Sequence, residues 1–225
     1  MIFTFWEGQM PAYIKLCLET WKLPYTMLNY ENLNGYTDLD IVPVKRFTLP
    51  QIADVVRVHV LRDQGGYWLD ADTVMLTGKL PDAVILGNPD KRTNSIGMLH
   101  AERHSEMFIR WAQFQDEIIN RTDTPTHWAT MGNAFTDPYL QEYKDIPIGS
   151  IENYWPETYM VNDCIPRYEK YLRFYFEQSH KLADIRQCDL LMLHNSWTPT
   201  WYKMMSRNEV MDVDCTLSNI LREIL

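Results

Sequence analysis

Residues 52–73 of this chain read IADVVRVHVLRDQGGYWLDADT. In the first part of the stretch, apolar residues recur at helical spacing as far as Gln64. Gly65-Gly66 then ends the run as a helix C-cap does, and Tyr67-Trp68-Leu69 is rich in strand formers. The stretch therefore predicts a helix over residues 50–64, a sharp glycine turn and a short strand.

Two carboxylates follow the predicted strand. In an extended segment Asp70 and Asp72 share one side, while Ala71 faces the other way. Converging carboxylates are hard oxygen ligands that suit Mg²⁺ or Mn²⁺, and such an ion can bridge to a diphosphate. The pair therefore predicts a metal site at the carboxyl end of a strand, although acidic pairs are also common in solvated turns.

The predicted helix carries a second polar pair. Asp54 and Arg57 are three residues apart and share one helix face. One interpretation is an ordinary surface ion pair, which contributes roughly 0–1 kcal/mol. The other is a polar patch beside the ligand crevice, where Arg57 is available to a sugar or a phosphate.

The same reasoning applied to the rest of the chain predicts an α/β fold. Strands are expected at residues 2–6, 25–30, 67–69, 84–86 and 190–193, and further helices at residues 11–23, 106–120 and 166–179. Residues 122–156 are dense in Pro, Gly, Asn and aromatic residues, and we expect irregular structure there. The alternation in the first half favours a mostly parallel sheet with ligands at the carboxyl ends of its strands.

Composition limits the classes of function. The 225 residues suit one domain, and Lys and Arg total 21 against 30 Asp and Glu, a net charge of -9. This balance argues against a nucleic-acid-binding surface, which needs a basic stripe. The four cysteines show no zinc-finger spacing, and we find no signal-peptide pattern and no apolar run near the roughly 18 residues that span a bilayer. We therefore expect a cytoplasmic protein, at most peripherally associated with a membrane.

The motifs taken together resemble a known family. Ala53-Asp54 with Arg57, then Gly65-Gly66 and Leu69-Asp70-Ala71-Asp72, resemble the signature of the DXD-containing glycosyltransferases of the family 32 type, which include bacterial capsular-polysaccharide synthesis proteins. The segments Phe5-Trp6-Glu7-Gly8 and Cys17-Leu18-Glu19-Thr20-Trp21 resemble the family's opening strand and first helix. The resemblance extends to about residue 75.

The resemblance implies a fold and a reaction. The fold is the GT-A type, a Rossmann-like mixed sheet flanked by helices, with an irregular and partly helical C-terminal half. Residues 1–225 would form one domain, with a nucleotide-sugar-binding half at 1–90 and an acceptor half with the closing segment at 91–225. The reaction is hexosyl transfer with retention, and it depends on Mn²⁺ or Mg²⁺. The donor is a UDP-sugar more readily than a GDP-sugar, and the acceptor is a glycan or another hydroxyl compound. Any membrane association would then be peripheral, with membrane-bound glycan machinery.

The resemblance also implies roles for individual residues. Asp70, Asp72 and Arg57 are the implied catalytic residues. Leu193-His194-Asn195-Ser196-Trp197 resembles the family's closing His/Ser/Trp segment, although an ordinary strand end with a buried tryptophan fits equally well. The implied metal ligands are Asp70, Asp72 and His194. The implied donor-binding residues are Phe5, Trp6, Asp54, Arg57, Asp70, Ser196 and Trp197. Acceptor contacts are expected between residues 95 and 156, where the candidates are His100, His127, Trp128, Asn133 and Asp137.

Two other functions fit parts of the sequence. Asp70-Ala71-Asp72-Thr73-Val74 also matches the D-x-D-x-[TV] loop of haloacid-dehalogenase-like phosphohydrolases, in which the first aspartate is the nucleophile. That loop normally follows the first strand, whereas here it comes after a third of the chain. The other alternative is a catalytically silent carbohydrate- or nucleotide-binding domain, which the 8 Trp and 13 Tyr could serve. Metal-dependent hydrolysis of a donor would separate the enzyme from the silent domain.

Overall fold

In the computed structural model, the helix, the turn and the strand of the quoted stretch lie where the sequence predicts them. Helix α3 (Leu49–Gln64) follows Thr48, whose backbone N–H donates to Gln51 Oε1 at 3.2 Å. Gly65 ends the helix with a φ of +67°, in the left-handed region that favours glycine. Strand β3 (Gly66–Leu69) begins at the next residue, so the end of α3 and the start of β3 are joined without a loop.

Replacement of Gly65 by alanine is expected to destabilise the protein. A Cβ at this position would lie 2.6 Å from the backbone nitrogen of Arg103, and the positive φ adds strain. Strain of this kind costs about 1–3 kcal/mol, so we expect calorimetry to show a Tm lower by roughly 2–12 °C. Gly35→Ala is the matched control, because a Cβ there would meet no atom of the described residues within 4 Å. Equal losses of Tm in the two variants would contradict the argument.

The structure describes residues 1–121, 127–185 and 188–225, so the first five residues of the segment predicted to be irregular, 122–126, lie outside the described residues. The chain divides into two compact units that alternate along the sequence. Unit 1 comprises Met1–Gly8, Pro24–Asp70 and Asp82–Ser150. Unit 2 comprises Gln9–Leu23, Ala71–Pro81 and Ile151–Leu225. The D-x-D motif therefore contributes its first aspartate to unit 1 and its second to unit 2.

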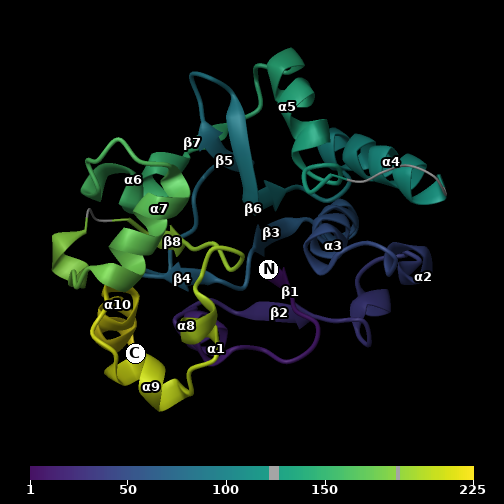
Figure 1. The fold of residues 1–225 in the computed structure, drawn as a ribbon. Coiled ribbons are helices and arrows are strands. Elements are labelled where there is room, and N and C mark those ends of the chain that lie inside the picture. The colour runs from purple at the N-terminus through teal and green to yellow at the C-terminus, as the bar shows by residue number, and fades with distance from the viewer. Residues whose placement is uncertain (122–126, 186–187) are drawn as a thin grey trace. The chain divides into compact units, whose positions relative to one another are not determined.

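Within the described residues, unit 1 is built on a six-stranded mixed sheet (Figure 1). In spatial order its strands are β2 (Tyr25–Leu28), β1 (Ile2–Phe5), β3 (Gly66–Leu69), β6 (Thr93–Ala101), β5 (Ile85–Asn88) and β7 (Ile148–Ser150). β1 pairs in parallel with β2 and β3, and β5 pairs in parallel with β7. The predicted α/β class with a mixed sheet flanked by helices is confirmed.

Strand β6 is the element that makes the sheet mixed, and the sequence analysis missed it. It is antiparallel to both neighbours, with Trp68 opposite Leu99 on one side and Gly87 opposite Asn94 on the other. Its first residues, Thr-Asn-Ser, are polar and give no strand pattern, and only a four-residue connection joins it to β5. Such a short connection produces an antiparallel hairpin, so the sheet is less parallel than expected.

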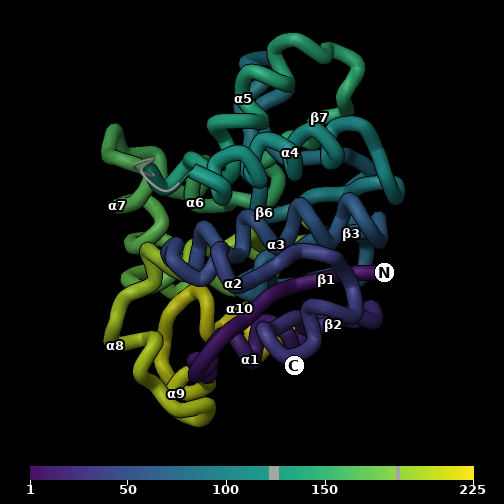
Figure 2. Tube along the Cα trace, turned by 90° about the vertical axis from the view of Figure 1, so that its right-hand side faces the viewer, coloured from purple at the N-terminus to yellow at the C-terminus, as the bar shows by residue number. Residues whose placement is uncertain are grey.

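The core of unit 1 lies between the sheet and two helices. Helix α3 packs against β1, β3 and β6, and both views of the chain show it alongside β1 and β3 (Figures 1 and 2). Helix α4 (Glu106–Asn120), at the predicted position, packs in turn on α3. The two helices and β3 contribute Val55, Val56, Leu61, Trp68, Phe108 and Trp111 to one buried apolar cluster. This packing fixes α3 against β3 and therefore places the polar residues of α3 beside the end of that strand.

The segment expected to be irregular contains regular structure. Helix α5 (Asn133–Glu142) begins after Gly132 and includes Pro138, and β7 follows it. Unit 1 also contains two short elements, η1 (Leu33–Gly35) and α2 (Ile41–Val44). The Gly and Pro signals were therefore misleading at α5, where packing against β6 and α4 stabilises a helix that local propensity does not favour.

Unit 2 is mainly helical around a two-stranded antiparallel sheet. The strands are β4 (Thr73–Met75) and β8 (Leu190–Met192), with Val74 opposite Leu191. The helical elements are α1 (Ala12–Glu19), η2 (Ile151–Tyr154), α6 (Glu157–Met160), α7 (Arg167–Leu172), η3 (Arg173–Glu177), η4 (Leu182–Asp184), α8 (Thr200–Lys203), α9 (Arg207–Asp212) and α10 (Thr216–Ile224). The helix predicted at 166–179 is confirmed as α7 and η3, whose second part is a π-helix. The sequence analysis missed the three helices after residue 199.

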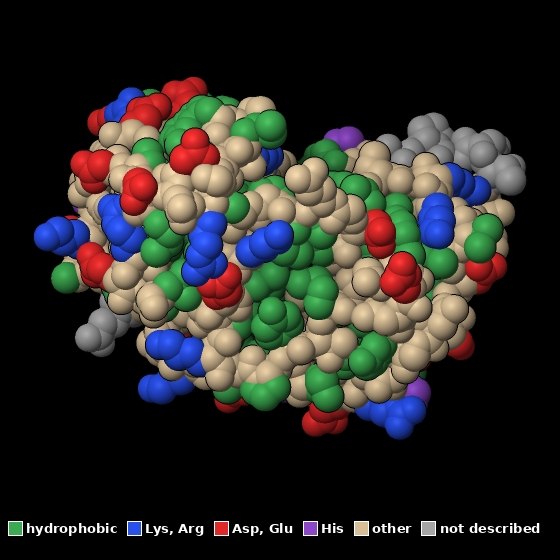
Figure 3. Space-filling view, turned by 90° about the horizontal axis from the view of Figure 1, so that it is seen from below, with side chains coloured by type: hydrophobic (Ala, Val, Ile, Leu, Met, Phe, Trp, Pro, Cys, Tyr) green, Lys and Arg blue, Asp and Glu red, His purple; other side chains and the backbone are tan. Residues whose placement is uncertain are grey.

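Across the described parts of the chain, each helix is too short or too polar to cross a lipid bilayer. On the face that Figure 3 shows, Lys and Arg side chains are interspersed with Asp and Glu side chains. On this face an anionic ligand would therefore meet individual basic residues and not a continuous basic surface.

Candidate functional site

Arg57 joins two carboxylates at the carboxyl end of β3 in unit 1. Its Nη2 lies 3.0 Å from Asp54 Oδ1 and 3.1 Å from Asp70 Oδ1. The other guanidinium nitrogens donate to backbone carbonyls, Nε to Ala53 at 3.3 Å and Nη1 to Ile96. Each nitrogen of the guanidinium therefore already has a partner within unit 1. This arrangement makes Arg57 a residue that holds Asp70 in place.

The Asp54–Arg57 pair is buried, so the interpretation as a surface ion pair is wrong. Asp54 is 9% and Arg57 4% exposed. Burial is the main cause that raises the pKa of Asp54 to about 7; the Arg57 charge opposes this rise and the Asp70 charge adds to it. Two carboxylates share one guanidinium, which leaves an excess of negative charge at this end of the strand.

Two neutral residues that the sequence analysis did not select support this arrangement. Trp68 Nε1 donates to Asp70 Oδ1 at 2.9 Å, and the Arg57 guanidinium lies 5.2 Å from the centre of the Trp68 ring. Gln115 of α4 is fully buried and donates to the backbone carbonyl of Asp54 at 3.0 Å. Only the alignment of α4 beside α3 reveals the role of Gln115, because the two residues are far apart in sequence.

The D-x-D segment is a turn, and not the extended strand that the sequence analysis assumed. β3 ends at Leu69, residues 70–72 turn, and β4 begins at Thr73. The argument that alternation places Asp70 and Asp72 on one side is therefore wrong. The chain itself still keeps the two Cα atoms within about 7 Å of each other, since only Ala71 separates them.

Asp72 belongs to unit 2 and is bound by the segment after β8. It is 8% exposed, and its Oδ2 accepts a hydrogen bond from the backbone N–H of Asn195 at 2.6 Å. The Tyr13 hydroxyl donates to Asn195 Oδ1 at 2.5 Å, and burial, followed by the Asp72 charge, raises the pKa of Tyr13. Asp72 thus lies beside the His-Asn-Ser-Trp segment, as the resemblance implies, and the contact is made by Asn195, which was not a predicted site residue.

His194 contacts a cation. Its Nε2 lies 2.6 Å from Arg167 Nη2, and because a guanidinium only donates, the imidazole accepts this hydrogen bond. Burial, followed by the Arg167 charge, lowers the pKa of His194 to about 3. The Trp197 ring lies 4.1 Å from that of His194, and Ser196 is exposed in the adjoining turn. At neutral pH His194 is therefore an uncharged imidazole with its proton on Nδ1.

The two aromatic residues predicted at the nucleotide lie at the end of β1. Phe5 is buried in the core of unit 1, with its ring 5.7 Å from that of Tyr30. The backbone N–H of Trp6 donates to Leu28 O at 3.0 Å, which extends the parallel pairing with β2. Within the described residues, the buried Trp6 Nε1 has no hydrogen-bond partner. A ligand oxygen would satisfy this donor, whereas Phe5 shapes the core behind it.

The acceptor candidates all belong to unit 1. His100 stacks on Tyr67 with ring centres 4.1 Å apart. Asn133 and Asp137 are both hydrogen-bonded to Asn94 of β6, and Asp137 Oδ1 accepts from Asn94 Nδ2 at 2.7 Å. His127, Trp128 and Asp137 are exposed, whereas His100 and Asn133 are partly buried. Trp128 is 71% exposed, which makes it the largest aromatic surface in this group.

We tested the implied metal site against the donor atoms. No group of three or more His, Cys, Asp or Glu that could hold an ion exists among the described residues. The contacts that the Asp70 side chain makes with Arg57 and Trp68 both use Oδ1, and the side chain is 37% exposed, so Oδ2 is suited to an ion. Asp72 also supplies carboxylate oxygen. His194 does not fit in this arrangement, because its Nε2 lone pair accepts from Arg167 and its Nδ1 carries the proton, so neither nitrogen offers a lone pair to an ion.

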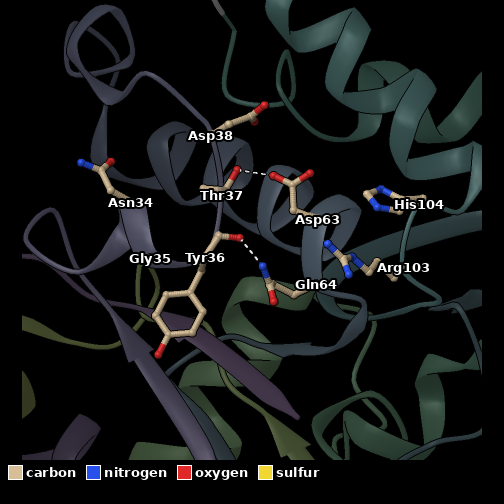
Figure 4. Close-up of a pocket in the computed structure, with 9 residues that line it drawn as sticks. All are labelled: Asn34, Gly35, Tyr36, Thr37, Asp38, Asp63, Gln64, Arg103 and His104. Atoms are coloured by element: carbon tan, nitrogen blue, oxygen red, sulfur yellow. Dashed lines mark hydrogen bonds between the residues drawn. The ribbon is translucent and has the colours of Figure 1, made fainter.

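A shallow pocket of about 350 Å³ lies elsewhere on unit 1 (Figure 4). It is lined by residues 34–38, by the end of α3, and by Arg103 with His104. Thr37 Oγ1 donates to Asp63 Oδ2 at 2.6 Å, and Gln64 Nε2 donates to the Tyr36 carbonyl at 2.8 Å. The pocket is next to the amino end of β3, whereas Asp70 follows the carboxyl end. It therefore contains none of the predicted site residues.

Comparison with known proteins gives one family. A family model described as "Capsular polysaccharide synthesis protein" matches residues 1–194. No curated protein matches the sequence. Among solved structures, a chain titled "PaToxG Glycosyltransferase" aligns with a TM-score of 0.46 and 15% identity, covering 63% of this chain and 67% of that one.

Proposed function

The chain belongs to the family of capsular polysaccharide synthesis proteins, and from this premise we propose that it is a metal-dependent glycosyltransferase of the GT-A type. The proposed donor is a nucleotide-sugar, UDP-linked in preference to GDP-linked, and the acceptor is a glycan or another hydroxyl compound. The observation that carries the proposal is the contact of the buried Arg57 with Asp70. It holds Asp70 at the carboxyl end of β3, two residues before Asp72. That is the position at which α/β sheets bind ligands.

The proposed roles follow from the contacts of each residue. Asp70 faces ligand and ion with Oδ2, because Arg57 and Trp68 occupy Oδ1. Arg57 is a positioning residue, since its own donors are used within unit 1. Asp54 provides the second carboxylate that keeps Arg57 in place. Trp6 Nε1, which has no hydrogen-bond partner in the described part of the chain, is a donor for the nucleotide.

The chemistry requires charge stabilisation more than proton transfer by the protein. Cleavage at the anomeric carbon passes through an oxocarbenium-like transition state and leaves negative charge on the diphosphate. A Mn²⁺ or Mg²⁺ ion held by Asp70 and Asp72 would stabilise that charge as a Lewis acid. Retention, which the resemblance implies, is consistent with front-face transfer in which the departing phosphate takes the acceptor's proton, so we assign no general base.

A thermal-shift screen tests the proposal. UDP, GDP and their sugars are each added with Mn²⁺ and with EDTA. A ligand present at 100 times its Kd stabilises the folded state by about 2.7 kcal/mol, so we expect a midpoint higher by roughly 5–10 °C only when nucleotide and metal are both present. If no nucleotide shifts the midpoint and the protein instead hydrolyses a phosphomonoester, the phosphohydrolase alternative replaces the transferase. Metal-dependent binding without hydrolysis of any donor would favour the silent binding domain.

A further inference from the structure

Unit 2 contains an arginine that lies close to two tryptophan rings. The guanidinium of Arg167, at the start of α7, lies 3.2 Å from the centre of the Trp155 ring and 5.2 Å from that of Trp197. We refer to these two rings as the aromatic clamp. Aromatic faces attract a guanidinium and restrict its orientation without using its N–H groups. The two rings therefore restrain the Arg167 side chain and leave its N–H groups for other partners.

Among the residues that the structure describes, only Nη2 of the Arg167 guanidinium has a hydrogen-bond partner. Nη2 donates to Glu157 Oε1 at 3.3 Å and to His194 Nε2 at 2.6 Å. Nε is buried, and within the described residues it has no hydrogen-bond partner. Nη1 likewise makes no hydrogen bond to the described chain, and the side chain as a whole is 31% exposed. This is the opposite of Arg57, whose nitrogens are all occupied.

The counter-charge of Arg167 is incomplete. Glu157 is fully buried, and its Oε2 has no hydrogen-bond partner among the described residues. Burial raises the pKa of Glu157 to about 7 despite the nearby guanidinium, so near neutral pH the carboxyl is protonated in part of the molecules. Burial also lowers the pKa of Arg167. The carboxyl partner of Arg167 is therefore only partly ionised, and the guanidinium has an N–H group without a partner among the described residues. A bound anion would supply the missing counter-charge.

The clamp is connected to the second aspartate of the D-x-D motif. Arg167 contacts His194, and the next residue, Asn195, donates its backbone N–H to Asp72 Oδ2 at 2.6 Å. Tyr171, also on α7, accepts a hydrogen bond from the His194 backbone N–H at 3.2 Å, so the turn is fixed to the helix that carries Arg167. Both the proposed metal ligand and the clamped arginine are thus bound to the same short segment of unit 2.

We propose that Arg167 binds a phosphate oxygen of the donor's diphosphate through Nη1, with Trp155 and Trp197 as the aromatic residues that restrain the guanidinium and Glu157 as its carboxylate partner. The inference rests on the proposed function, which supplies the diphosphate. A planar guanidinium presents its donors in a fixed geometry that matches phosphate oxygens. It would therefore bind the group on which negative charge accumulates as the sugar leaves.

Titration calorimetry with Mn²⁺ at pH 7.5 tests this assignment, with UDP, inorganic pyrophosphate and uridine as ligands. Arg167→Lys keeps the charge but removes the planar guanidinium, and we expect UDP and pyrophosphate to bind about 10- to 100-fold more weakly, with uridine affinity unchanged. Arg173→Lys is the matched control, because Arg173 lies on the following turn and pairs with the exposed Asp163. It should leave all three affinities unchanged.

Glu157→Gln provides a second readout that a purely structural pair would not give. Glutamine keeps an oxygen for Arg167 and removes the competing negative charge, so UDP and pyrophosphate should bind several-fold more tightly. This gain should be larger at pH 8 than at pH 6, because the wild-type carboxyl is more fully ionised at pH 8. This variant also keeps the proposal falsifiable if Arg167→Lys does not fold: affinity that is unchanged or weaker in Glu157→Gln overturns it.

The outcomes separate this inference from the proposed function. Unchanged pyrophosphate and UDP affinity in folded Arg167→Lys overturns the inference, even if the wild type transfers sugar. A wild type that binds neither pyrophosphate nor UDP overturns it as well. If the wild type binds both through Arg167 but transfers no sugar from any donor, the phosphate site stands and glycosyl transfer fails.

Discussion

Replacement of Arg57 by methionine is expected to lower the free energy of unfolding by about 3–5 kcal/mol, because it leaves buried carboxylates without their shared cation. Asp54 is 9% exposed, whereas the Asp70 side chain is 37% exposed, so Asp54 carries most of this cost. Chemical denaturation followed by circular dichroism measures the change. In the same variant the nucleotide-sugar donor should no longer stabilise the protein, because Asp70 loses the contact with Arg57 that positions it.

The pH dependence of this loss has a definite sign. Arg57 holds down a pKa that burial raises, so without the arginine the pKa of Asp54 rises further above its unfolded value. A carboxyl with a raised folded pKa is most stabilising when protonated, and that contribution is lost as pH rises through the folded pKa. The destabilisation by Arg57→Met should therefore be larger at pH 8 than at pH 5.5.

Two further variants control this experiment. In Asp54→Asn combined with Arg57→Met no buried charge remains on α3, so the double variant should recover much of the lost stability while donor binding remains lost. Arg110→Met removes an arginine of α4 that pairs with Glu106 at the surface. The midpoint of its chemical denaturation should equal that of the wild type. A double variant no more stable than Arg57→Met would show that the uncompensated Asp54 charge is not the cause.

Replacement of Asp72 by asparagine is expected to reduce kcat/KM by at least about 10²- to 10³-fold while the protein stays folded. The amide oxygen can still accept the hydrogen bond from the Asn195 N–H, so the turn after β8 keeps its anchor. The charge that would hold Mn²⁺ or Mg²⁺ is lost, and with it the stabilisation of the leaving diphosphate. The assay is metal-dependent transfer or hydrolysis of the nucleotide-sugar identified in the thermal-shift screen.

Asp212→Asn is the matched control for Asp72→Asn, because Asp212 is an exposed aspartate of the same unit, at the end of α9. Its kcat/KM should equal that of the wild type. Both variants should unfold near the wild-type midpoint without ligand, and only Asp72→Asn should lose the midpoint shift with nucleotide and Mn²⁺. Near-normal turnover by Asp72→Asn would contradict the metal-dependent mechanism.

Much of the first unit could be predicted from the sequence, because the signals there are local. The helical spacing before Gln64, the Gly65-Gly66 turn and the strand formers Tyr67-Trp68-Leu69 each act over a few residues. Strand β6 was missed because its polar start gives no pattern, and only pairing with β3 and β5 makes it a strand. The helix α5 was missed because its stability comes from packing that overrides Gly132 and Pro138.

The sequence by itself determined which residues were candidates for chemistry. The acidic pair, the Asp54 and Arg57 spacing and the family resemblance are properties of residue order, and order alone places Asp70 and Asp72 close together. Tertiary structure decided what those residues do. It buried Arg57 beside two carboxylates and placed the Asn195 N–H on Asp72. It also placed Arg167 beside Trp155 and Trp197, with an Nε that has no partner among the described residues.

The physical reason for this division is the distance along the sequence over which each interaction acts. Helix periodicity, glycine turns and chain connectivity depend on neighbours within a few residues and can be read along the chain. Burial and the pairing of charges depend on which distant segments meet, as Arg167 and His194 do across 27 positions and Asp72 and Asn195 do across 123. These long-range contacts determine the pKa values of the buried groups and the hydrogen-bond partners of the two arginines. Only the folded chain therefore decides that Arg57 holds an aspartate and that Arg167 is available to a ligand.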